Sequence, residues 1–249
     1  MIKEDNIDEI VNYHKNKISQ LSVKLKQSRK DDPFISDIKS QIAEHYAQIA
    51  HSYYKSNKFT DAFKEYTKAL YFNPEHLTVI NQLGIIKLKD GSNLSAIDYF
   101  QKIIGLVKDE RDLHFKVDAM LSLALAILNE NHVGAINKAN KLIEMAETIS
   151  PDYSEIYKLK NKIEQQRNFE STIKEIKKSI SNDKFNDAEK FINGAKKLYP
   201  NNSVVNEEED RLRLQIFISN SKNKKNNLTL FGSKKDDGVP TQPERNSLT

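Results

Sequence analysis

Residues 61–74 read DAFKEYTKALYFNP, and the spacing of residues within them returns twice along the chain. Its two alanines, Ala62 and Ala69, are seven residues apart, and Pro74 follows the second after five residues. The same spacing returns at Ala139, Ala146 and Pro151, and again at Ala188, Ala195 and Pro200. Seven residues make about two turns of an α-helix, so each alanine pair lies on one helix face and the proline ends that helix. Three copies of the spacing indicate a repeated helical unit.

The unit resembles the tetratricopeptide repeat family, whose repeat is a helix–turn–helix of about 34 residues. With Pro74 at repeat position 32, the signature positions of the first unit hold permitted residues: Tyr46, Ile49, Ala50, Tyr53, Phe59, Ala62, Tyr66 and Ala69. The second unit keeps the register at Ile80, Leu83, Gly84, Ala96, Phe100 and Ile103, and departs from it at Lys87 and Lys108. The resemblance covers roughly residues 43–200 and is looser in the units that end at Pro151 and Pro200. It implies an all-α, right-handed α-solenoid of helical hairpins.

Composition supports an all-α chain. The 249 residues include only 7 Gly and 6 Pro, too few for the many turns of a β protein. There is no Cys, which excludes a disulfide scaffold, a thiolate metal site and a cysteine nucleophile. At the turns we expect Thr60 to cap a helix at its N-terminus and Gly91 to adopt a left-handed conformation.

We divide the chain into four parts. Residues 1–34 are predicted to form an N-terminal helix, residues 35–151 about three repeats, residues 152–219 a long helix with capping helices, and residues 220–249 a disordered basic tail. Within residues 7–29, one narrow apolar seam runs through Ile7, Val11, His14, Ile18, Leu21 and Leu25. A helix that packs on the solenoid is favoured over a dimerising coiled coil, because the seam barely reaches three heptads.

Enzyme motifs are missing from the sequence. There is no glycine-rich phosphate loop, no His-Glu-x-x-His and no nucleophile elbow. The six histidines are scattered, and His45 and His51 are six residues apart, which places them on different sides of a helix. We therefore expect neither a metal nor a cofactor, and no catalytic residue. The chain outside the tail is close to neutral, so nucleic acid is not an expected partner.

A binding groove is what remains. In tetratricopeptide arrays the first helix of each unit lines a concave surface, and the resemblance implies a groove formed by His51, Tyr54, Asn81, Ile85, Leu88, Lys89, Leu121, Leu125 and Leu128. The family's clamp for carboxylate termini is disfavoured, because Ala47, His51 and Gln82 stand where Lys and Asn are required.

The stretches 79–88 and 120–128 are apolar nearly all round, so something must cover the leucines of the groove. A partner's helix or peptide is one occupant. The chain's own segments, either residues 7–29 or the helix that starts after Asp152, are the other, and the sequence does not choose between them.

The tail contains one apolar island, Leu228, Leu230 and Phe231, which resembles short peptides that dock on bacterial sliding clamps, with Asn227 in place of Gln. The leading hypothesis is a non-catalytic interaction scaffold, an adaptor or chaperone-like protein that holds a partner protein's peptide or amphipathic helix. The alternatives are an assembly component that forms a homodimer through its N-terminal helix, and docking through the tail. No signal peptide or membrane span is apparent, so we expect a cytoplasmic protein.

Overall fold

The computed structural model describes the backbone of residues 4–29, 31–130 and 134–231, and the side chains of residues 7–29, 31–130 and 134–222. Within these ranges the chain forms ten α-helices, one short 3-10 helix and no strand, which confirms the all-α prediction. The helices are α1 (Glu4–Gln27), α2 (Ile35–Lys55), α3 (Phe59–Phe72), α4 (Leu77–Lys89), α5 (Asn93–Leu106), α6 (Leu113–Asn129), α7 (Ala135–Ile149), α8 (Ser154–Ser181), α9 (Phe185–Leu198) and α10 (Ser203–Phe231), with the 3-10 turn η1 (Glu110–Asp112) before α6.

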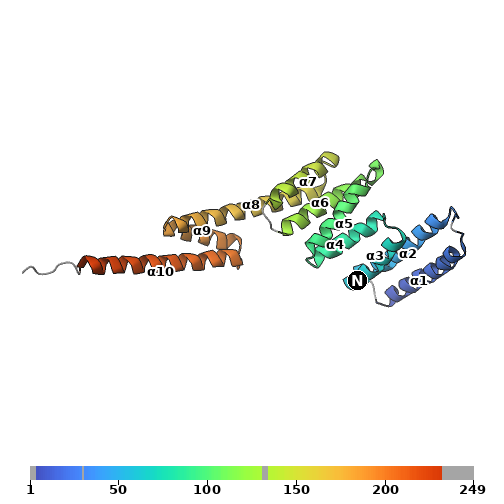
Figure 1. Ribbon diagram of the computed structural model, residues 1–249, viewed down its shortest axis with the longest axis horizontal. Helices are drawn as coiled ribbons and strands as arrows, with labels where there is room; N and C mark the ends of the chain where they lie inside the picture. Colours follow the sequence, from blue (N-terminus) through green and yellow to red (C-terminus); the bar gives the residue numbers. More distant parts are fainter. Residues whose placement is uncertain (1–3, 30, 131–133, 232–249) are drawn as a thin grey trace, which may run out of the picture. The chain divides into compact units, whose positions relative to one another are not determined.

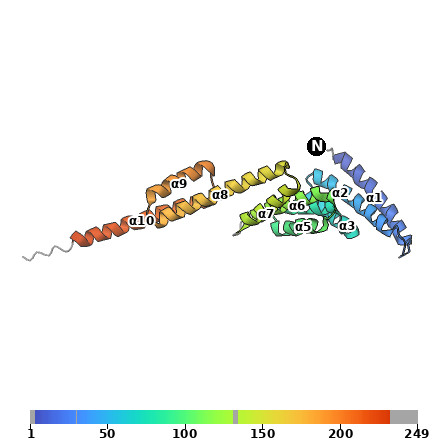
Figure 2. The same cartoon turned by 90° about the horizontal axis from the view of Figure 1, so that it is seen from above.

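The chain divides into two compact units, residues 1–164 and 165–249, so the division falls inside α8. The division at residues 151 and 152 made from the sequence stays a prediction. In unit 1 the helices follow one another side by side as consecutive pairs, in the tetratricopeptide-like manner (Figures 1 and 2). Unit 2 consists of the rest of α8 with α9 and α10.

Three hairpins share one turn. Asn57, Gly91 and Asp183 each have a positive φ and each stand two residues before the second helix of a pair. In all three turns a backbone N–H bonds to the carbonyl five residues earlier at 2.9 Å, as in Lys58 to Tyr53. This is the Schellman ending of a helix, and it shows that α8 and α9 form a hairpin of the same kind as α2–α3 and α4–α5. Gly91 therefore behaves as predicted, whereas Thr60 does not cap α3, which already begins at Phe59.

Small residues set the helix spacing. Four alanines at signature positions of the repeat are fully buried, namely Ala50, Ala62, Ala69 and Ala96, and their short side chains allow the helices to approach closely. Gly84 is tighter still, because a Cβ atom there would lie 2.7 Å from Cε1 of the Phe100 ring. Tyr66 and Phe100 fill the space between neighbouring helices, with 2% and 0% of their surface exposed.

Helix α1 caps the array. Its seam residues Ile7, Val11 and Ile18 are buried against Ile42 and Ile49 of α2. The favoured prediction for residues 7–29 is thus confirmed. These contacts bury the apolar seam that a dimer through the N-terminal helix would need.

The last helix is longer than expected. Residues 220–231 were predicted to belong to a disordered tail, but α10 continues to Phe231. No Gly or Pro interrupts the chain between Pro200 and Gly232, so nothing in the local sequence ends the helix earlier. The remainder of the predicted tail, residues 232–249, lies outside the described residues.

Candidate functional site

A cavity of about 360 Å³ opens between the start of α3 and the end of α4. Its floor is apolar, formed by Phe59, Phe63 and Ile86. Charged side chains and one hydroxyl complete the lining: Thr60, Lys64, Lys87, Lys89 and Asp90. Cavities of this size with an apolar floor and a few polar groups are typical ligand sites.

Two lysines of α4 lie over aromatic rings beside this cavity. The Lys89 ammonium is 4.9 Å from the ring centres of both Tyr54 and Phe59, and these two rings meet edge to face at 5.3 Å. The Lys87 ammonium is 4.6 Å from the ring centre of Phe63. Cation–π contacts of this kind hold the long lysine side chains against the aromatic wall. We call this group of five residues the aromatic–lysine cluster.

The two lysines differ in their anionic partners. Lys87 also lies 3.3 Å from a carboxylate oxygen of Asp90. Hydrogen bonds from Ser92 and then the Lys87 ammonium hold the pKa of Asp90 below its usual range. In the described part of the chain, no carboxylate lies within 4.0 Å of the Lys89 ammonium. Lys89 is thus the cation of this cluster that is available to an incoming anion.

The structure brings together some of the predicted groove residues. Tyr54 and Lys89, from the first and second units, meet in the aromatic–lysine cluster. His51 is exposed on α2, and Asn81, Ile85 and Leu88 are half-buried on α4. The side-chain oxygen of Asn81 is buried and accepts no hydrogen bond from a described residue.

The leucines of α6 are covered by the chain itself. Leu121 and Leu128 are only 7% and 3% exposed, and Leu125 is half-buried. They pack with Ile156, Leu159 and Ile163 of α8, within unit 1. Of the two occupants that the sequence left open, the helix that starts after Asp152 therefore covers this part of the groove.

Polar contacts fasten α8 to the same face. The Tyr153 hydroxyl donates a hydrogen bond of 2.5 Å to the Asp118 carboxylate, and this bond raises the pKa of Tyr153 to about 12. Lys162 donates to the Asn129 side chain at 3.4 Å. A cavity of about 300 Å³ remains between the two helices, lined by Leu121, Ser122, Leu125, Glu155, Lys158, Leu159 and Lys162.

Sequence reasoning missed three residues of the aromatic–lysine cluster. Phe59 was predicted only as a signature residue of the repeat, Phe63 was not among the predicted site residues, and Lys87 was given only as a departure from the repeat signature. All three lie close to the helix ends around the turns at 57–58 and 90–92. That position was the available signal, since side chains near helix ends are seldom fully covered by neighbouring helices.

Two histidines that are far apart in the sequence lie side by side in the structure. His14 of α1 and His45 of α2 are joined by a hydrogen bond of 2.9 Å between their Nδ1 atoms. His76 lies 3.2 Å from a carboxylate oxygen of Glu44. Even so, no group of three metal-ligating side chains is found among the described residues.

The tail residues Leu228, Leu230 and Phe231 fall on the last turns of α10, and their side chains lie outside the described ones. None of the described helices is long and apolar enough to cross a bilayer.

The comparisons with known proteins bear on the fold and not on the function. No protein-family model matches the chain, and no curated protein matches it. Among solved structures, the chain is similar to the N-terminal domain of stress-induced protein-1 (STI-1) from C. elegans, with 17% identity over 51% of this chain and 97% of that one and a TM-score of 0.43. It is also similar to PilF of Pseudomonas aeruginosa, with 16% identity over 84% of this chain and 98% of that one and a TM-score of 0.43. The fold itself is an all-α array of tetratricopeptide-like helical hairpins.

Proposed function

We propose that this chain is a non-catalytic protein-interaction scaffold that holds a partner's peptide at the aromatic–lysine cluster of α2, α3 and α4. The observation that carries the proposal is Lys89, an exposed cation that lies over two aromatic rings beside an apolar cavity and has no carboxylate partner among the described residues. Aromatic side chains are enriched where proteins bind one another. A cation over an aromatic ring adds an electrostatic attraction that holds the lysine at such a site.

The cavity supports the choice of ligand. Its apolar floor accommodates one aromatic or branched aliphatic side chain, whose burial would be the main source of affinity. Lysines at its rim favour a carboxylate next to that side chain. The partner chemistry is therefore a short peptide with an apolar residue flanked by Asp or Glu.

The proposal narrows the predicted groove. His51, Asn81, Ile85 and Leu88 remain in it as neighbours of the cluster on α2 and α4, whereas Leu121, Leu125 and Leu128 belong to the packing of α6 against α8. Substituting Leu125 would therefore be a test of stability and not of binding. A cytoplasmic location and an adaptor or chaperone-like role are part of the same proposal.

The test uses fluorescein-labelled pentapeptides with a central Phe or Leu, flanked by Asp or by Lys, and measures fluorescence anisotropy with the full chain. We expect the acidic peptides to bind and the basic ones not to bind. Lys89→Glu should weaken binding about tenfold, equivalent to about 1.4 kcal/mol.

The matched control is Lys102→Glu, which makes the same charge change at an exposed position of α5. It should leave the affinity unchanged. Equal binding of acidic and basic peptides, or equal losses in the two variants, would contradict the proposal.

A further inference from the structure

Helix α10 carries two lines of residues at alternating spacings of three and four. The first line is Val205, Glu208 and Leu212, all buried. It packs in the core of unit 2 with Ile176 and Ile192. Spacings of three and four keep such residues on one face of a helix, and this inner face is fully used within unit 2.

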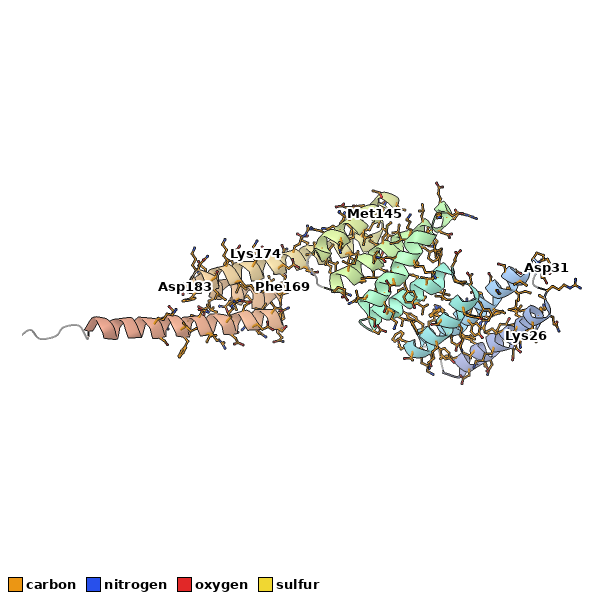
Figure 3. All side chains as sticks on the ribbon, viewed as in Figure 1. Lys26, Asp31, Met145, Phe169, Lys174 and Asp183 are labelled. Atoms are coloured by element: carbon orange, nitrogen blue, oxygen red, sulfur yellow. The ribbon has the colours of Figure 1, made fainter. Side chains whose placement is uncertain are left out.

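Charged groups next to the inner face also find partners inside the unit. Glu208 lies 3.5 Å from the Lys177 ammonium of α8, and Lys196 of α9 donates a hydrogen bond to Glu209. Phe169 of α8 meets Tyr199, the residue after α9, with ring centres 4.7 Å apart, and Figure 3 shows Phe169 on the side of α8 that faces α9. The inner face therefore fixes how α10 sits within unit 2.

The second line lies on the opposite side of α10. It runs through Glu207, Asp210, Leu214, Phe217 and Ser221, again at spacings of three and four. Its two apolar members are strongly exposed, Leu214 by 57% and Phe217 by 68%. Figures 1 and 2 both show α10 running on past α9. Two large apolar side chains adjacent on one helix face and open to solvent are typical of an interaction surface.

Charge along the outer face has a direction. On the outer line Glu207 and Asp210 come before the apolar pair, and Lys222, Lys224 and Lys225 follow that pair along the chain. Arg213 reaches back to Glu209 at 3.1 Å and to Asp210 at 3.7 Å. Glu207 makes no ion pair with any described residue.

We propose that the outer face of α10 binds the outer face of α10 in a second copy of this chain, with the two helices antiparallel. A two-fold axis between residues 215 and 216 makes the outer line self-complementary. Leu214 then faces Phe217 of the second copy, and Asp210 faces Ser221 of the second copy. Glu207 and Asp210 of each helix then lie against residues 221–224 of the other, which include Lys222 and Lys224, and every contact occurs twice, as in an isologous interface.

A parallel pair does not satisfy the same sequence. It would place Glu207 and Asp210 of the outer line against their own copies, and like charges in direct contact are unfavourable. An antiparallel pair combines the apolar centre with two attractive ends, so charge complementarity selects both the partner and its direction.

The first experiment measures the mass of the full chain by light scattering after size exclusion, from about 5 to 200 µM, the range in which a small helix-pair interface dissociates. We expect the mass to approach twice 28.7 kDa with rising concentration. Leu214→Glu combined with Phe217→Glu should weaken the association at least tenfold while circular dichroism stays unchanged, because both side chains are already exposed. Leu198→Glu, at a 73% exposed position of α9, is the matched control and should still dimerise. A wild-type chain that stays monomeric throughout overturns the proposal.

The second experiment fixes the direction and uses the absence of cysteine from the chain. Asp210→Cys and Ser221→Cys variants are prepared separately, and are oxidised alone and as an equal mixture. In the antiparallel pair these positions face each other across the axis, whereas each is about 16 Å along the helix from its own copy. A disulfide requires Cα atoms about 4.4–6.8 Å apart, so only the mixture should cross-link. Cross-linking of each variant with itself, or none in any tube, overturns the antiparallel pair.

Discussion

At the scale of single residues, the contact between α1 and α2 depends on protonation. A hydrogen bond between the Nδ1 atoms of His14 and His45 requires one ring to be neutral, since a protonated nitrogen has no lone pair to accept. Burial lowers the pKa of both histidines from about 6.5, and the pKa of His14 falls further because of the neighbouring His45. Glu44 opposes both shifts, while Lys17 adds to that of His45.

The free energy of unfolding should therefore fall between about pH 7.5 and 5.5. With folded pKa values below 6.5, the unfolded chain takes up more protons as the pH drops through and below that value, and this favours unfolding. Urea unfolding at several pH values measures the slope. His14→Gln combined with His45→Gln should reduce it, although His51, whose pKa is also lowered by burial, keeps part of it.

The matched control is His114→Gln, at an exposed position, which should leave the slope as in the wild type. If the double variant keeps the full slope as well, the pair is not its source.

Some of these single residues could be predicted from the sequence, and others could not. Gly91 and the alanines at 62 and 69 were predictable because a left-handed turn and a close helix contact each accept only small residues. The His14–His45 contact was not, because it joins positions 31 residues apart on two helices whose mutual rotation is set by apolar packing.

At the scale of elements, the contact between α4 and α5 depends on one missing methyl group. Gly84→Ala would place a Cβ atom 2.7 Å from the Phe100 ring, which is fully buried. Overpacking costs about 1–3 kcal/mol. Alanine's higher helix propensity returns about 1 kcal/mol, so a net loss of up to about 2 kcal/mol in the free energy of unfolding is expected.

Gly105→Ala on α5 provides the control for this substitution. No atom lies within 4 Å of a Cβ built there, so only the helix-propensity gain remains. Urea unfolding of the two variants should give changes of opposite sign. A gain in both would mean that the Phe100 ring yields to the added methyl group.

Elements also show why the site was only partly predictable. The apolar surplus on α6 was visible in the sequence, but what covers it was not, since a partner helix and the chain's own α8 present the same apolar chemistry. Only two of the five residues of the aromatic–lysine cluster, Tyr54 and Lys89, were predicted as groove residues. The repeat register places Tyr54 and Lys89 in the groove, whereas Phe59 and Phe63 reach the cavity from α3, the second helix of the unit, which the register does not place in the groove.

At the scale of the whole molecule, each unit has its own hydrophobic core. Ile143 is 1% exposed in the cluster that joins α6, α7 and the first part of α8. Ile192 is 2% exposed in the cluster of unit 2. Unfolding of one unit should not spread to the other through α8 alone, because a helix in water is stabilised mainly by packing on its apolar face.

Local stability should therefore be separable. Ile143→Ala and Ile192→Ala make the same truncation, and each should cost about 2–5 kcal/mol in its own unit. Amide hydrogen exchange followed by mass spectrometry should show Ile143→Ala speeding exchange before residue 165 and Ile192→Ala speeding it after that residue. Faster exchange over both units in either variant would mean that α8 couples the two cores into one cooperative structure. In that case, a ligand bound at the aromatic–lysine cluster would also stabilise α10 and the association proposed for it.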